Sequence, residues 1–297
     1  MTVKIPKKLG DGGAFIAAEG KRNSLRSILS SMASDLRSHE TSINFGSGEL
    51  PALADGTSLG MIKTQNAISY TLNGTMYTKA ATDNLFDLSA ETDLPTHIAN
   101  GTTAGKLKAT AAIPYFLAAL QSFPITDDVW DLSAEVDTIG AQYRAYWLYL
   151  TAAGVASIGA GTNAASAVAA LAALPAVPAG KIAVGTYVAG PSTDFNNAGG
   201  LSGQGTITEI QYKAYWLLLD SSGIASLSAG IRVTPSSQAV ARLPVLDGTK
   251  FPVGTYVAGP KIDFNGGGGL AAQGTIADGI PSGYSWSFNG RLLTLVG

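Results

Sequence analysis

The sequence contains no cysteine and only two histidines, His39 and His97. Without cysteine the chain has no disulfide framework, no thiolate zinc site and no cysteine nucleophile. Two histidines do not suffice for a multi-histidine metal site, and neither lies near a Gly-x-Ser-x-Gly elbow that would carry a nucleophilic serine. These absences predict a protein that is not an enzyme and that needs no metal or cofactor.

Charged residues are scarce, at 13 % of the chain against roughly a quarter in ordinary soluble proteins. The surface must therefore consist largely of Ser, Thr, Asn, Gly and Ala. Such a surface repels its neighbours weakly, which suits a protein held in a permanent assembly. The net charge of −2 provides no field that would attract nucleic acid or an acidic membrane.

Long uninterrupted apolar runs are also missing. The most apolar segment, residues 164–178, is shorter than the roughly 20 residues of a membrane-spanning helix and contains Pro175 and Pro178. We therefore expect no membrane insertion.

The chain does contain a tandem repeat. Residues 145–148 (AYWL) recur at 214–217, and residues 185–191 (GTYVAGP) recur at 254–260, both at an offset of 69. Because the offset is constant, the copies align without a gap, which indicates duplicated structure. We place the first repeat at residues 141–209 and the second at 210–278.

Each repeat is predicted to be β-β-α-β-like. Residues 143–150 alternate in the manner of a strand, and residues 155–158 return after a turn as its partner. Residues 164–174 are rich in Ala and Leu and long enough for about three helical turns. Strands are expected at 182–189 and 206–210, on either side of a glycine-rich loop. The expected fold class is mainly β with short helices.

The remaining chain divides into three further segments. Residues 41–140 are predicted to form a β-rich domain with an Asn-Gly hairpin at residues 67–79, and residues 279–297 a C-terminal β-hairpin. Residues 82–91 resemble residues 126–135 at an offset of 44, which we interpret as a shortened or diverged earlier unit. Residues 1–40 are predicted to be an extended arm and an amphipathic anchoring helix.

The anchoring helix has one apolar face, which carries Leu25, Leu29, Met32 and Leu36. A lone helix of about 20 residues is marginal in water unless it packs on something. The sequence leaves open whether this face docks on its own fold or forms a short bundle between copies. We predict these four residues as the anchoring or partner contact.

Asp194 and Asp263 occupy the same position in the two repeats and precede glycine-rich loops. We expect each to cap its own loop, as aspartate commonly does. Calcium ligation is the less favoured alternative, because the later bidentate glutamate of an EF-hand is missing. The loops also lack the Gly-Lys-Ser/Thr of a phosphate-binding loop.

The paired aromatics Tyr146-Trp147 and Tyr215-Trp216 are the candidate exposed contacts. Neighbours on a strand face opposite sides, so one residue of each pair belongs to the core and the other could be exposed. An exposed ring could pack against a subunit or stack on a sugar, and subunit contact is the favoured of these two roles. Burial of the aromatics in the repeat's own core is favoured over both.

Several segments resemble structural proteins of bacteriophage virions, the class of head-decoration, head-fibre and minor tail components. The segments are residues 4–15, 25–37, 83–93, 145–150 and 152–161. The resemblance implies a β-rich oligomer, often a trimer, that is assembled in the host cytoplasm and contacts capsid or tail subunits. It carries no active-site residues.

We expect a capsid-decoration or head-fibre protein anchored by its N-terminus. The alternatives are a tail, collar or baseplate component, and an adhesin that binds a host surface glycan through Trp147 and Trp216.

Overall fold

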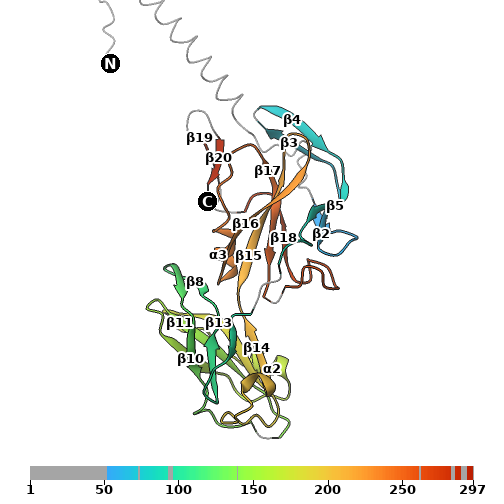
Figure 1. The fold of residues 1–297 in the computed structure, drawn as a ribbon. Coiled ribbons are helices and arrows are strands. Elements are labelled where there is room, and N and C mark those ends of the chain that lie inside the picture. Colours follow the sequence, from blue (N-terminus) through green and yellow to red (C-terminus); the bar gives the residue numbers. More distant parts are fainter. Residues whose placement is uncertain are drawn as a thin grey trace, which may run out of the picture.

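The computed structural model describes residues 52–72, 74–92, 96–138, 140–260, 262–281, 285–288 and 293–296. The predicted N-terminal arm and helix, with Leu25, Leu29, Met32 and Leu36, lie outside these residues. The expected fold class is confirmed, because the described chain is built of antiparallel strands with two short α-helices (Figure 1).

Each 69-residue repeat forms a four-stranded antiparallel sheet. In the first repeat the sheet order is β12-β11-β13-β14, and in the second it is β16-β15-β17-β18. The first repeat comprises β11 (Arg144–Thr151), β12 (Ala156–Ala160), α2 (Ala167–Ala172), β13 (Lys181–Ala189), the 3-10 helix η1 (Leu201–Gly203) and β14 (Gly205–Glu209). The second comprises β15 (Tyr212–Leu219), β16 (Ala225–Val233), α3 (Ser236–Val240), β17 (Phe251–Ala258) and β18 (Gly274–Asp278).

The helix of the first repeat is shorter than its Ala/Leu-rich sequence predicts. It begins after Ser166, whose hydroxyl accepts a hydrogen bond from the Ala169 amide at 3.2 Å, as an N-cap serine does. It ends three residues before Pro175, because proline disfavours helical geometry in the residue that precedes it.

The chain ahead of the repeats contains two copies of a five-stranded unit. Each unit has a three-stranded sheet, β1-β2-β5 or β6-β7-β10, and a separate hairpin, β3-β4 or β8-β9. The first unit comprises β1 (Leu53–Asp55), β2 (Met61–Thr64), β3 (Ile68–Leu72), β4 (Thr75–Lys79) and β5 (Thr82–Asp87). The second comprises β6 (Ile98–Asn100), β7 (Lys106–Ala109), β8 (Ile113–Leu117), β9 (Ala119–Phe123) and β10 (Thr126–Asp131). At the C-terminus, β19 (Ser285–Phe288) pairs with β20 (Leu293–Val296).

The echo at an offset of 44 therefore has a different origin from the one the sequence suggested. It is the last strand of a five-stranded unit that occurs twice, and not a shortened 69-residue repeat. The equivalent strands begin 45 residues apart at β1 and β6 (98 − 53) and 44 apart at β5 and β10 (126 − 82). The one-residue difference falls in the hairpin turn, and residues 41–140 accordingly hold two units.

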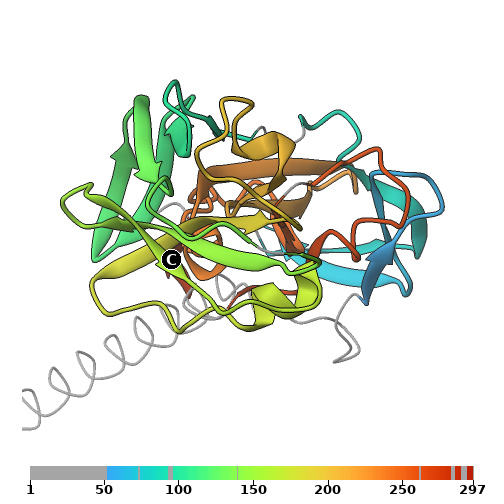
Figure 2. The same cartoon turned by 90° about the horizontal axis from the view of Figure 1, so that it is seen from below.

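The two units and two repeats pair in a nested order, in which the first and last segments of the four pack together and enclose the middle two in the sequence. The first unit packs on the second repeat, in a core that includes Phe86, Tyr70 and Tyr215. The second unit packs on the first repeat, in a core that includes Trp130, Tyr115 and Tyr146. We call the second unit with the first repeat the inner module, and the first unit with the second repeat the outer module (Figures 1 and 2).

The same polar contacts join unit and repeat in both modules. The Tyr70 hydroxyl donates to the Asp220 carbonyl oxygen at 2.7 Å, and the Tyr115 hydroxyl lies 2.9 Å from the Thr151 carbonyl oxygen. In each case a tyrosine from the hairpin reaches the end of the central strand of the partner sheet. The packing of unit on repeat is therefore itself duplicated, because equivalent tyrosines make the same contact in both modules.

We predict that the inner module folds alone whereas the two units together do not. A fragment of residues 96–210 retains one complete core and should melt in a single cooperative transition. A fragment of residues 41–140 contains both units without their partner sheets, and should show no cooperative melt by circular dichroism. A cooperative melt of the 41–140 fragment would contradict the nested pairing.

Candidate functional surfaces

The predicted exposed aromatics are mostly buried. Tyr146, Tyr215 and Trp216 have 0 % exposure, and Trp147 is partly buried. The candidate role of exposed contact is therefore wrong for Tyr146, Tyr215 and Trp216, and the burial that the sequence favoured is observed, because both faces of the central strands are covered. One face meets the five-stranded unit and the other carries the repeat's helix.

Both indoles are also held by the same hydrogen bond. The Trp147 Nε1–H donates to the Pro175 carbonyl oxygen at 2.9 Å, and the Trp216 Nε1–H donates to the Pro244 carbonyl oxygen at 3.0 Å. Each tryptophan thus fastens the chain after the helix to the sheet. This role is structural, and Trp216 cannot serve as a platform for a sugar ring.

A cation and a glutamate accompany the buried tyrosine in each module. Arg144 lies 3.5 Å from Glu135 and above the Tyr146 ring, 5.3 Å from its centroid. In the outer module, Lys213 lies 3.2 Å from Glu91 and 4.8 Å from the Tyr215 ring centroid. Burial raises the pKa of Tyr146 and of Tyr215, so both phenols stay neutral at ordinary pH and pack in the core.

The aspartates of the glycine-rich loops cap their own loops, as the sequence predicts. The Asn196 amide donates to Asp194 Oδ1 at 2.9 Å, and the Asn265 amide donates to Asp263 Oδ1 at 3.0 Å. Within the part of the chain that the structure describes, no three His, Asp or Glu side chains group together as a metal site would require.

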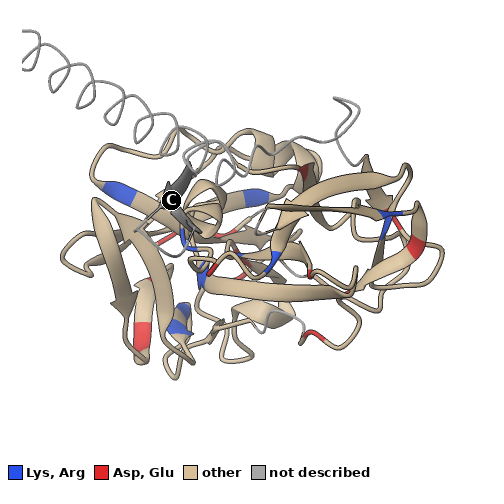
Figure 3. Cartoon of the chain, turned by 90° about the horizontal axis from the view of Figure 1, so that it is seen from above, with Lys and Arg blue, Asp and Glu red and all other residues tan. Residues whose placement is uncertain are grey.

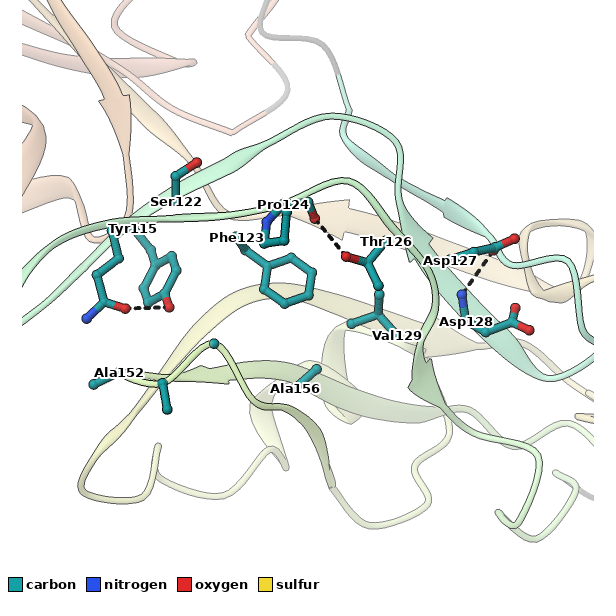
Figure 4. Close-up of a pocket in the computed structure, with 13 residues that line it drawn as sticks. Tyr115, Ser122, Phe123, Pro124, Thr126, Asp127, Asp128, Val129, Ala152 and Ala156 are labelled. Atoms are coloured by element: carbon teal, nitrogen blue, oxygen red, sulfur yellow. Dashed lines mark hydrogen bonds between the residues drawn. The ribbon is translucent and has the colours of Figure 1, made fainter.

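An open groove of about 610 Å³ lies beside the inner module's β8-β9 hairpin (Figure 4). Its titratable groups are Tyr115, Asp127 and Asp128, and all three are engaged locally. The Tyr115 hydroxyl proton is shared between Gln121 Oε1, at 2.6 Å, and the Thr151 carbonyl oxygen.

The two aspartates of the groove bind the neighbouring turn. Asp127 accepts from the Thr102 amide at 3.1 Å, and Asp128 accepts from the Thr103 amide at 3.0 Å. The threonine hydroxyls donate to the same carboxylates. Hydrogen bonding by Thr103 lowers the pKa of Asp128, which keeps it ionised as a structural acceptor. Asp83 binds the Thr57 amide in the same way in the outer module, so this arrangement belongs to the unit's fold.

The two modules meet through a buried charged cluster. Glu209, 3 % exposed and at the end of β14, lies 3.5 Å from His97 of the inner module and 3.4 Å from Arg232 on β16 of the outer module. The His97 amide also donates to the Glu209 carboxylate. Burial raises the pKa of Glu209 and lowers that of His97. The guanidinium of Arg232 therefore compensates a carboxylate that is otherwise costly to bury.

A second contact joins the inner module's β8-β9 hairpin to the second repeat. The Phe116 amide donates to the Thr234 carbonyl oxygen at 2.8 Å, and Gln211 Nε2 donates to the Pro114 carbonyl oxygen at 3.1 Å. The Phe116 ring lies 5.0 Å from the Arg242 guanidinium and packs on the cluster around Trp216. The hairpin thus packs beside α3, where the chain leaves β16.

Charged residues elsewhere are scattered singly, with both signs interspersed, over the view in Figure 3. No helix in the described ranges is both long and apolar enough to cross a membrane.

The chain matches no protein-family model, and searches of curated proteins and of solved structures find no similar protein.

We predict that Arg232→Met destabilises the protein in a pH-dependent way. Removing the guanidinium leaves a buried carboxylate without its cation, which costs about 3 kcal/mol at pH 7. The folded-state pKa of Glu209 is already raised above 4.5 and rises further in the variant. The penalty is therefore small below pH 4.5, where the carboxyl is protonated in both states, and grows as the pH rises.

Urea unfolding at pH 4 and pH 7 measures this penalty. The double variant Glu209→Gln/Arg232→Met is the control, and it should recover much of the lost stability because neither charge remains. An equal loss at both pH values would show that the ion pair is not the cause.

Proposed function

We propose that this chain is a structural component of a bacteriophage virion, an oligomeric capsid-decoration or head-fibre protein anchored by its N-terminal segment. The observation that carries the proposal is the duplicated, nested build. Each module uses the same aromatic core, the same ion pair over a tyrosine and the same aspartate-capped loops. The Glu209 carboxylate is engaged in joining the modules, and the described aspartates at positions 127, 128, 194 and 263 hold their own turns and loops.

This use of side chains suits a protein that must fold, assemble and persist. A surface with little charge favours lasting contact with neighbouring subunits. Two stacked modules also make an extended body, as a projecting protein requires (Figure 1). The resemblance of the segments quoted above to phage structural proteins agrees with this proposal.

A tail, collar or baseplate component shares all of these properties and differs in its place on the particle. The adhesin alternative has lost one of its stacking platforms, because Trp216 is fully buried. Immunogold labelling of intact particles separates the locations. Label on the head supports the proposal, and label on the tail favours the tail alternative. A purified protein that binds no particle would overturn both.

We predict that deleting residues 1–40 abolishes incorporation into particles. Both large cores are formed by residues between Ile62 and Leu270, so the truncated protein should keep the melting temperature of the full chain. Incorporation is measured by blotting purified particles, with the full-length protein as the control. Normal incorporation of the truncated protein would show that the anchor lies elsewhere.

A further inference from the structure

The contact between the two modules uses unlike surfaces. A hairpin, β8-β9 of the inner module, supplies one side. The outer, helix-bearing face of the second repeat supplies the other, at Thr234 between β16 and α3. The two modules are related copies, and each has both kinds of surface. A contact between unlike surfaces uses one surface of each module and leaves the other surface of each module free. The duplication therefore predicts where the free surfaces lie: the outer face of the first repeat and the β3-β4 hairpin.

The outer face of the first repeat is exposed where its counterpart is covered. Leu246 of the second repeat is 6 % exposed, whereas the equivalent Val177 (246 − 69) is 41 % exposed. Thr234, which receives the hairpin, is 2 % exposed, whereas the equivalent Ala165 is exposed. Helix α2 adds Leu171, which is 41 % exposed, whereas its equivalent Val240 (171 + 69) is half-buried against the cluster around Trp216.

This face also keeps the polar group that binds a hairpin in the second repeat. Gln211 donates to the β8 backbone at Pro114. Its equivalent in the first repeat is Gln142 (211 − 69), which is again a glutamine and is exposed. The first repeat thus presents the same side-chain amide and an apolar helix beside it.

The β3-β4 hairpin is the equivalent of the hairpin that docks within the chain. Thr71 on β3 stands at the position of Phe116 (116 − 45). Its cross-strand neighbour Met76 is 67 % exposed, and the equivalent Leu120 of the docked hairpin is 45 % exposed, so this position stays open to solvent in both hairpins. Figure 1 places this hairpin near one end of the molecule and α2 near the other.

We propose that copies of this chain associate head to tail, with the β3-β4 hairpin of one copy docked on the outer face of the first repeat of the next. The occupant is a second copy because a hairpin and a repeat already bind each other once within the chain at the equivalent positions. The hydrogen bonds there go to the hairpin backbone at Phe116 and Pro114, so they do not depend on the ring that Thr71 replaces. The repeated step generates a ring or a filament. The association concerns the chain's own repeats and holds wherever the protein resides.

Cysteine crosslinking tests this contact cleanly, because the natural chain contains no cysteine. Thr71→Cys and Ala165→Cys stand at the equivalents of Phe116 and Thr234, whose backbones are joined at 2.8 Å. The double variant, purified as the full chain and oxidised, should form a covalent ladder of dimers and larger species on a non-reducing gel. The mismatched control combines Thr71→Cys with Ile224→Cys, an exposed site in the second repeat, and should yield no ladder.

A surface variant gives a second readout. We expect the mass of the natural chain in mass photometry to increase with concentration. Leu171→Asp places a charge on the proposed face and should remove both this increase and the crosslinked ladder. The matched control Val155→Asp, at another exposed valine, should leave both unchanged. A double-cysteine ladder no stronger than that of the mismatched pair, or one that persists in Leu171→Asp, would overturn the proposal.

Discussion

The burial of one face of each four-stranded sheet against a five-stranded unit is the interaction on which the rest of the structure depends. It joins segments far apart in the chain, because the first unit meets the last repeat. It also brings loops of the unit and the repeat close together at Gly60 and Gly105, which both have positive φ. A Cβ at Gly60 would lie within 2.7 Å of the Phe264 carbonyl oxygen, and a Cβ at Gly105 would lie as close to the Phe195 carbonyl oxygen. Glycine is required there because two backbones approach closely in an otherwise strained conformation.

Sequence reasoning identified the repeats and their strands, because identical residues at a gapless offset and strict alternation are local signals. It did not identify the five-stranded units as a second duplication. Identical residues, such as Gly60 and Gly105 or Tyr70 and Tyr115, are spread through both units, but the offset changes from 45 to 44 at the hairpin turn. No single gapless offset therefore aligns the whole unit. The sequence also did not show that Trp216 is fully buried. Alternation along a strand shows which face of the sheet a residue occupies, but not which element covers that face. The nested order depends on long-range burial, which no local pattern records.

The copies differ most informatively where the modules meet. Arg232 aligns with Asn163, and Phe116 aligns with Thr71, so the ion pair and the aromatic ring at the junction occur in one copy only. Residues shared between the copies build each module and keep the glutamine that binds the hairpin backbone, and departures from the repeat add these two contacts within the chain. The buried Glu209 carboxylate fits this pattern, because its cation comes from the other module. Removing one partner of such a buried pair costs stability because it leaves an uncompensated charge.

Hydrogen exchange of Phe86→Ala tests the nested pairing most directly. Phe86 is 1 % exposed in the core of the outer module, and its truncation should cost about 3–5 kcal/mol. The account predicts faster amide exchange in β15 and β17 of the second repeat and unchanged exchange in β11 and β13 of the first. Faster exchange in β11 and β13, with β15 and β17 unaffected, would show that the first unit packs on its nearer repeat and would contradict the nested architecture.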